Sequence, residues 1–219
     1  MLLETYRQNT HNANSERIGK QDSLSEFISG EVLDQMRQEA MITGAQGVRA
    51  YFGRYPDNYT DLDLAGRQSL VFTVEVLKYS PNRFIVSEDV IAFGPTLRIN
   101  KNTVDALLTT YRQISHKINS ERIGKEDSSS VLLSLEILDQ IREEIVLKDT
   151  SGIHAYFGRY PNDYIDTDLA GRQTLVLTVG DLKSSPDGFI VPEGLFAFFD
   201  MPFCPPVCNC GGPGLPSCH

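Results

Sequence analysis

Hydrophobic and polar residues alternate with two different periods along this chain, and each period predicts a different kind of secondary-structure element. Between residues 101 and 116, apolar side chains recur at intervals of three and four, which is typical of an amphipathic helix. The apolar stripe consists of Val104, Leu107, Leu108, Tyr111 and Ile114. Residues 48–53 instead alternate strictly between two sets of side chains, which predicts a β-strand with one face on the core.

The same succession of elements is written twice. Residues 6–93 align without a gap with residues 111–198, and 51 of the 88 aligned positions are identical at an offset of 105. Each stretch reads as an opening helix, a short strand, a second helix and three further strands. A repeat longer than the roughly 20–50 residues of a solenoid unit indicates a duplicated globular module. We therefore expect an α+β fold, with helices packed on a small, mostly antiparallel sheet in each half.

The second helix of each half has a recognisable start. Ser29 and Ser134 occupy the position of a helix N-cap, and an acidic residue follows each of them in the first turn. Gly47 and Gly152 come before the alternating strand and mark the exit from this helix.

The length of the chain indicates how it divides into halves and a tail, and its net charge argues against one class of partner. The 219 residues support a first half over residues 1–100, a second half over 101–201, each long enough to bury its own core, and a tail over 202–219. The net charge is -9 and no cluster of Lys or Arg is visible, which argues against nucleic acid as a partner. The chain start is unlike a secretory signal, and no apolar run is long enough for membrane insertion. A cytoplasmic protein is expected, with export by a signal-less route left open.

Motifs of known catalytic chemistry are missing from the sequence. It contains no G-x-S-x-G, H-E-x-x-H or P-loop pattern, and His11 and His116 have no Cys or Ser at a suggestive spacing. The loop after each alternating strand is acidic, with Asp57, Asp61 and Asp63 in the first half. It lacks the alternating ligands, central Gly and terminal Glu of an EF-hand loop, so we interpret it as a solvated loop rather than a Ca²⁺ site.

Tyrosines flank a glycine on the outward face of each alternating strand. They are Tyr51 and Tyr55 in the first half, and Tyr156 and Tyr160 in the second. Two amphipathic rings around a shallow gap predict a contact surface for another molecule. The alternative is that the opening helix, or the other half, covers this face.

The tail differs from both halves because it carries every cysteine of the chain. The candidate ligands are Cys204, Cys208, Cys210, Cys218 and His219. Cys204, Cys208 and Cys210 together with either Cys218 or His219 could hold one soft metal ion such as Zn or Cu. A disulfide between Cys204 and Cys208 would need a turn. The prolines on either side of Cys204 predict that regular structure stops before the first thiol. A flexible thiol-bearing tail without a metal is the alternative.

Several short motifs follow one another in a distinctive order. They are Phe27 to Asp34, Gly47 to Gly53, Gly66 to Phe72, and Cys204 to Cys208. In this order the chain resembles a group of small uncharacterised bacterial proteins with one such α+β module and a C-terminal Cys-Pro-Pro-x-Cys segment. The resemblance implies the fold and no activity. This chain differs in having the module twice and in adding Cys210 and Cys218.

These features together predict a non-catalytic binding or self-assembling structural protein, as an oligomer or filament subunit. A duplicated module offers two similar surfaces, related either by an approximate two-fold axis or by an open head-to-tail stack. One alternative is a thiol or metal carrier that acts through the tail cysteines. Others are a precursor whose tail is modified by another enzyme, and an enzyme with a site that no motif reveals.

Overall fold

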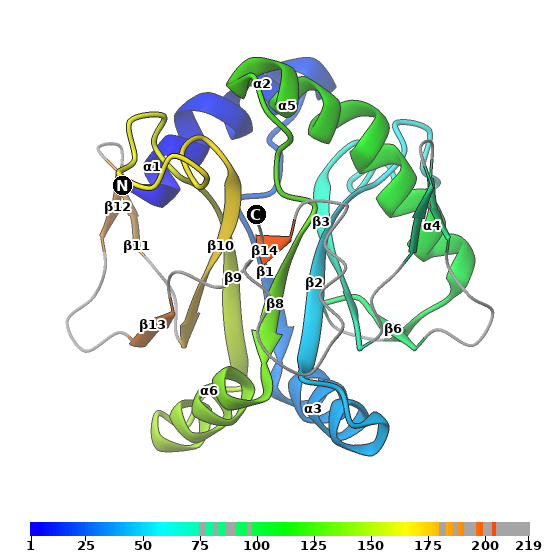
Figure 1. Ribbon diagram of the computed structural model, residues 1–219, viewed down its shortest axis with the longest axis vertical. Coiled ribbons are helices and arrows are strands. Elements are labelled where there is room, and N and C mark those ends of the chain that lie inside the picture. Colours follow the sequence, from blue (N-terminus) through cyan, green and yellow to red (C-terminus); the bar gives the residue numbers. More distant parts are fainter. Residues whose placement is uncertain are drawn as a thin grey trace.

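The protein is an α+β structure of helices and antiparallel sheets (Figure 1). The computed structural model describes residues 1–74, 78–80, 83–85, 91–95, 98–179, 183–185, 188–190, 196–198 and 203–204. No helix in these ranges is both long and apolar enough to cross a membrane.

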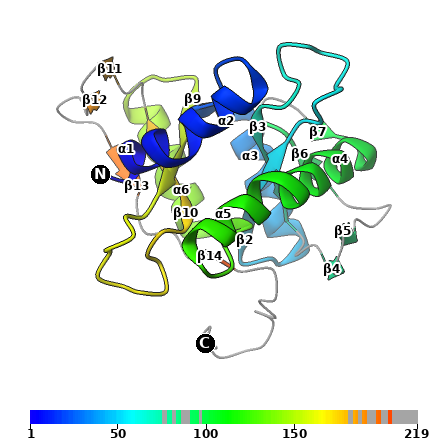
Figure 2. The same cartoon turned by 90° about the horizontal axis from the view of Figure 1, so that it is seen from above.

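Each half opens with a helical arm that contains a π-helical turn. The arms are α1 (Leu2–Tyr6), η1 (Arg7–His11) and α2 (Asn12–Ile18), and α4 (Lys101–Tyr111), η2 (Arg112–His116) and α5 (Lys117–Ile123). Figure 2 shows the two arms side by side across the top of the molecule, running in opposite directions. A π-helical turn is rare and often marks a functional position. It occurs at equivalent places in both arms, where its buried residues are Thr10 and His11 in the first arm and Ser115 and His116 in the second.

The second helices are α3 (Gly30–Thr43) and α6 (Leu135–Leu147), and both begin as predicted. Ser29 Oγ accepts a hydrogen bond from Val32 N at 3.3 Å, and Ser134 Oγ accepts one from Ile137 N at 3.2 Å. The helices contact each other through reciprocal ion pairs, Arg37 with Asp139 and Arg142 with Asp34. This exchange of equivalent partners is what an approximate two-fold axis between the halves produces.

Two antiparallel sheets carry most of the strands. The four-stranded sheet has the order β1 (Ser25–Ser29), β9 (Gly152–Arg159), β10 (Gln173–Val179) and β13 (Phe196–Phe198). The six-stranded sheet has the order β14 (Phe203–Cys204), β8 (Ser130–Ser134), β2 (Gly47–Arg54), β3 (Gln68–Thr73), β6 (Ala92–Phe93) and β7 (Arg98–Ile99). Two hairpins pair β4 (Lys78–Ser80) with β5 (Arg83–Ile85), and β11 (Lys183–Ser185) with β12 (Gly188–Ile190).

The halves exchange their first strands. β1 of the first half pairs with β9 of the second, and β8 of the second half pairs with β2 of the first. The two glycines before the alternating strands make this possible. A Cβ at Gly47 would overlap the Leu133 carbonyl oxygen, and a Cβ at Gly152 would overlap that of Ile28. The second helices end earlier than predicted, at Thr43 and Leu147, so these glycines do not mark the helix exit. They open β2 and β9 and allow the exchanged strand to approach.

The helical arms are exchanged as well. α1 packs on β9 and α4 packs on β2, so each arm covers the outer face of the other half's sheet. The inner faces form one core that spans both halves, in which the rings of Phe52 and Phe157 lie 6.3 Å apart. This arrangement differs from the expectation that each half buries its own core. Hydrophobic periodicity fixes which face of a strand is buried, and it carries no information about which half supplies the neighbouring strand.

Candidate functional site

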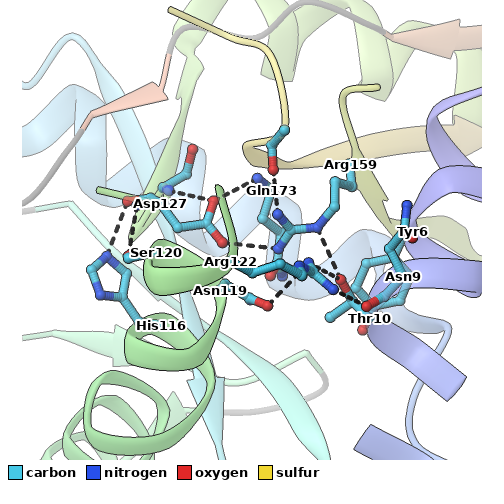
Figure 3. A network of polar contacts seen from close by, with 12 residues as sticks. Tyr6, Asn9, Thr10, His116, Asn119, Ser120, Arg122, Asp127, Arg159 and Gln173 are labelled. Atoms are coloured by element: carbon cyan, nitrogen blue, oxygen red, sulfur yellow. Dashed lines mark hydrogen bonds and ion pairs between the residues drawn. The ribbon is translucent and has the colours of Figure 1, made fainter. Parts of the chain in front are cut away.

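A buried polar network lies between the helical arms and the upper ends of the sheets (Figure 3). Its fixed centre is Asp127, in the segment that crosses from α5 to β8. Asp127 Oδ1 accepts hydrogen bonds from Ser128 N at 2.8 Å and Gln173 N at 2.7 Å. Its backbone N–H donates to Ser120 Oγ at 2.9 Å. The crossing segment is thereby fastened to both the arm and the sheet.

The second oxygen of Asp127 holds a buried cation. Arg159 Nη2 lies 2.9 Å from Asp127 Oδ2, and the two side chains are 1% and 0% exposed. Arg159 Nε donates to Thr10 Oγ1 at 2.9 Å, and its Nη1 donates to the Gly171 carbonyl oxygen. Thr10 comes from the π-helical turn of the other arm. Arg159 therefore joins the two halves at the point where both arms cross the sheets.

The first half uses the same residue types in a different arrangement. Asp22 Oδ1 accepts from Ser23 N and Gln68 N at 2.8 Å, as its counterpart does. Its Oδ2, however, accepts from Asn14 Nδ2 at 2.9 Å rather than from an arginine. Arg54 is fully buried and donates from Nη1 to Ser115 Oγ at 2.9 Å, while its Nε and Nη2 have no hydrogen-bond partner. The network thus takes two forms within one molecule.

A histidine and a tyrosine complete each form of the network. His116 Nε2 lies 3.0 Å from the Asp127 carbonyl oxygen, so this nitrogen carries the proton that it donates. Burial lowers the pKa of His116, which keeps the ring neutral near pH 7. Tyr111 Oη donates to the Ser128 carbonyl oxygen at 3.2 Å, and burial raises its pKa well above the usual value. These groups donate hydrogen bonds as neutral side chains, which suits a structural role.

A second asymmetry lies where each arm meets the acidic loop. Arg17 forms a two-pronged ion pair with Asp57, at 3.2 Å from Nη1 to Oδ2 and 3.3 Å from Nη2 to Oδ1. The equivalent of Asp57 is Asn162, which has no charge. Arg122, the equivalent of Arg17, instead donates to the Asn9 carbonyl oxygen, Thr10 and Asn119 (Figure 3). The two equivalent arginines therefore differ in their partners: Arg17 binds the acidic loop, whereas Arg122 binds groups at the centre.

Two surface pockets accompany the second arm. One of about 520 Å³ is lined by Arg122, Ile123, Gly124, Lys125, Asn162, Asp163, Tyr164, Thr167 and Ala170. The other, of about 560 Å³, follows η2 and α5 and is lined by Arg112, Gln113, His116, Lys117, Ser120, Glu121 and Glu126. Both are lined by charged side chains of both signs. Among the described residues, no group of three or more His, Cys, Asp or Glu side chains could hold a metal ion.

Glu26 of β1 is a largely buried carboxyl that the sequence analysis did not single out. Burial, the largest effect, raises its pKa from 4.5 to about 7, while a hydrogen bond from Ser69 opposes the shift. The second half has Val131 at this position, and the hydroxyl of Thr174, which replaces Ser69, is buried without a hydrogen-bond partner. The signal in the sequence was an acidic residue at an apolar position of one repeat only.

We expect the stability of the protein to fall as pH rises through the pKa of Glu26. The folded form holds this proton more tightly than the unfolded chain, so the contribution is complete below about pH 4.5 and is lost as pH passes 7. In the parent, Glu26 should make the unfolding free energy about 2–3 kcal/mol lower at pH 8 than at pH 5. The Glu26→Gln variant should lack this contribution to the pH dependence. Urea titrations at both pH values measure this, with exposed Glu16→Gln as the matched control. Equal pH dependence in the parent and the Glu26→Gln variant would contradict the assignment.

The predicted tyrosine surface is buried within the chain. Tyr51 is 3% exposed beneath α4, Tyr156 is 6% exposed beneath α1, and Tyr160 is 1% exposed. Tyr55 is half-buried, and its ring lies 4.7 Å from that of Tyr59. The expectation of an exposed contact surface is contradicted by this burial, because the exchanged opening helix covers each face. This was the alternative considered for these residues.

The tail enters the structure at its first cysteine. Phe203 and Cys204 form β14, which pairs with Val131 and Ser130 of β8. The expectation that regular structure stops before the first thiol is therefore wrong, because the extended backbone before Pro205 can still pair with a sheet edge. Cys208, Cys210, Cys218 and His219 lie outside the described residues, as does the proposed metal or disulfide site that includes them.

Comparisons with known proteins found no relative of this chain. No family model, no curated protein and no solved structure matches the chain.

Proposed function

We propose that the protein is a non-catalytic structural protein that associates with other molecules of itself through the free edge of β1. The observation that carries this proposal is a difference between two equivalent strands. The outer edge of β8 is covered by β14, whereas β1 pairs with β9 alone among the described residues. An uncovered strand edge presents unpaired N–H and C=O groups and is a template for another strand.

The hydrogen-bond pattern identifies which groups are free. Leu24 O accepts from Phe157 N, and Gly30 N donates to Ser151 O. Because bonding alternates along an antiparallel pair, the backbone groups of Ser25, Phe27 and Ser29 point away from β9. None of these three residues is charged or a proline, and the Phe27 side chain is 37% exposed. At these three positions of the described chain, neither a charge nor a proline therefore opposes pairing with another strand.

A second molecule fits this edge through its own β1. In an antiparallel arrangement about a two-fold axis, Phe27 faces Phe27 of the second molecule, and Ser25 faces Ser29. The facing aromatic rings would add cross-strand packing to the backbone bonds. β14 on β8 supports this proposal, because it indicates that the equivalent edge has room for a neighbour. Association through β1 would join two four-stranded sheets into one.

Assemblies larger than a dimer need another surface. Equivalent apolar pairs lie near the ends of α3 and α6: Met41 and Ile42 are 55% and 71% exposed, and Val146 and Leu147 are 74% and 78% exposed. Exposed apolar groups of this kind often mark contacts with other proteins. Their presence in both halves favours an oligomer or filament subunit over an isolated dimer.

Charge substitution at Phe27 tests the proposal. We expect the parent to reach twice the 24.5 kDa chain mass with rising concentration in size-exclusion chromatography with light scattering. Phe27→Lys and Phe27→Glu should each weaken association at least about tenfold, because like charges would face each other, and mixing the two variants should restore it. Leu132→Lys in β8 is the matched control and should associate like the parent. A parent that stays at 24.5 kDa, or variants that associate like the parent, would refute the use of this edge.

A further inference from the structure

Four side chains of the buried network are identical in the two halves but are bonded differently. In the second half they are Arg122, Asn119, Asp127 and Arg159, and in the first half Arg17, Asn14, Asp22 and Arg54. We call the arrangement of the second half, in which the aspartate binds the strand arginine, the paired form, and that of the first half the unpaired form. Because the same four residue types build both forms, each half carries the groups that either form needs.

In the paired form the helix arginine binds the asparagine. Arg122 Nη2 donates to Asn119 Oδ1 at 3.3 Å (Figure 3). The Nδ2 of Asn119 is buried and has no hydrogen-bond partner among the described residues. Asp127 Oδ2 accepts from Arg159 Nη2 at 2.9 Å, and Arg159 Nε donates to Thr10 Oγ1 at 2.9 Å. The asparagine therefore leaves this aspartate oxygen to the strand arginine.

In the unpaired form the helix arginine binds the acidic loop. Arg17 Nη1 lies 3.2 Å from Asp57 Oδ2, and its Nη2 lies 3.3 Å from Asp57 Oδ1. Asn14 donates from Nδ2 to Asp22 Oδ2 at 2.9 Å, which is a bond that the equivalent asparagine does not make. The amide thus occupies the carboxylate oxygen that would otherwise be open to Arg54.

The unpaired form leaves Arg54 as a buried cation. Arg54 is 0% exposed and donates from Nη1 to Ser115 Oγ at 2.9 Å, while its Nε and Nη2 have no hydrogen-bond partner in the described part of the chain. Burial of a charge is costly unless the charge is both paired and hydrogen-bonded. This cost raises the free energy of the unpaired form and favours an alternative in which Arg54 binds a carboxylate.

The carboxylate that could neutralise Arg54 is already in position. Asp22 Oδ1 accepts from Gln68 N at 2.8 Å, and Gln68 is the register partner of Arg54 between β3 and β2. The second half relates the equivalent residues in the same way: Asp127, Gln173 and Arg159. Once Asn14 releases Oδ2, Asp22 can accept from Arg54 without leaving its backbone donors.

We propose that the first half switches between the two forms, and that the ion pair between Arg17 and Asp57 controls the switch. When Arg17 leaves Asp57 and binds Asn14, as its equivalent does in the second half, the amide leaves Asp22 and Arg54 takes its place. The side chains of Arg17 and Asp57 are 30% and 58% exposed, so salt screens this pair more than a buried one. A contact at the surface thereby determines how a buried charge is paired between the halves. The switch does not depend on the self-association proposed above.

The Nε–H group of Arg54 reports which form is present. In the unpaired form it has no partner among the described residues. In the paired form it should donate to Ser115 Oγ, because Arg159 Nε donates to the equivalent hydroxyl of Thr10. A hydrogen bond moves the proton signal downfield and slows its exchange with solvent, and NMR spectra of ¹⁵N-labelled protein measure both effects.

Two variants of the first half should produce the paired form. Asp57→Asn removes the exposed ion pair, and Asn14→Ala removes the amide that competes for Asp22. Each should move the Arg54 Nε–H signal downfield and slow its hydrogen exchange at least about tenfold. In the parent, raising sodium chloride from about 0.1 M to about 1 M should move the signal in the same direction, because the exposed pair is screened. Asp57→Asn should lack this salt dependence.

Two controls connect the signal to Asp22 and to the first half. Asp57→Asn combined with Asp22→Asn should leave the Arg54 signal as in the parent, because no carboxylate is present to pair with it. Asn119→Ala should leave the Arg159 signal unchanged, because Asn119 does not hold the aspartate oxygen of the second half. The switch is overturned if both Asp57→Asn and Asn14→Ala leave the Arg54 signal at its position in the parent. A shift with Asn14→Ala alone would overturn control by the exposed pair, and a shift that persists without the Asp22 carboxylate would overturn the pairing.

Discussion

Replacing Asp127 by alanine is expected to lower the free energy of unfolding by about 3–5 kcal/mol, because the change leaves the cation of Arg159 buried without a counterion. Arg159 is only 1% exposed and cannot turn to solvent without opening the contact between the halves. The loss also removes the acceptor of the Ser128 and Gln173 backbone N–H groups. Urea unfolding followed by far-UV circular dichroism measures the change.

The first half provides a matched control for this variant. Asp22 accepts equivalent backbone hydrogen bonds, but its second oxygen bonds neutral Asn14. Asp22→Ala should therefore cost only about 1–3 kcal/mol, the range for unsatisfied neutral donors. A combined Asp127→Leu and Arg159→Met variant should be more stable than Asp127→Ala alone, since it buries no unpaired charge. Equal losses for the Asp22 and Asp127 variants would show that the ion pair adds nothing to the backbone bonds.

Sequence pattern predicted the main helices and the longer strands, but it predicted neither their partners nor the π-helical turns and the shorter strands β4, β6, β7 and β14. The serine caps, the helical stripe and the alternation of Val48, Ala50 and Phe52 against Tyr51 are all present as predicted. Each of these features depends on residues close in sequence. Strand exchange depends on which of two nearly identical edges β1 meets, and identical sequences cannot encode that difference locally. The close approach at Gly47 was the available signal, since a glycine at a strand start also marks a tight backbone contact.

The candidate sites could not be predicted from the sequence for a related reason. The tyrosine face was predicted correctly as the outer face of β2, but its exposure depends on α4, which belongs to the other half. Two of the differences between the repeats concern these sites: Glu26 against Val131, and Asp57 against Asn162. An aligned repeat emphasises what is shared, whereas here the chemistry lies in what differs. Both places are among the aligned positions at which only one half carries a charge, but the sequence alone does not separate them from the other positions of that kind.

The shared core leads to a further expectation, that both halves unfold together. Phe157 of β9 packs against Phe52 of β2, and its ring also lies 5.7 Å from that of Tyr6 in the first arm. Phe157→Ala should lower the free energy of unfolding by about 3–5 kcal/mol, as large truncations in a core do. Both halves should lose stability, because the cavity left by the truncated ring would lie between them.

Hydrogen exchange distinguishes a shared core from two separate ones. In the Phe157→Ala variant, protection should fall to the same extent in β3 of the first half and β10 of the second, and calorimetry should show one transition. Phe52→Ala should behave alike, and the double variant should cost less than the sum of the two single changes, because the rings are in contact. Ile165→Ala, at a side chain that is 94% exposed, should change the stability by less than about 0.5 kcal/mol. Loss of protection confined to β10, with a second transition unchanged, would mean that the halves are stabilised independently and that the exchanged strands contribute no common core.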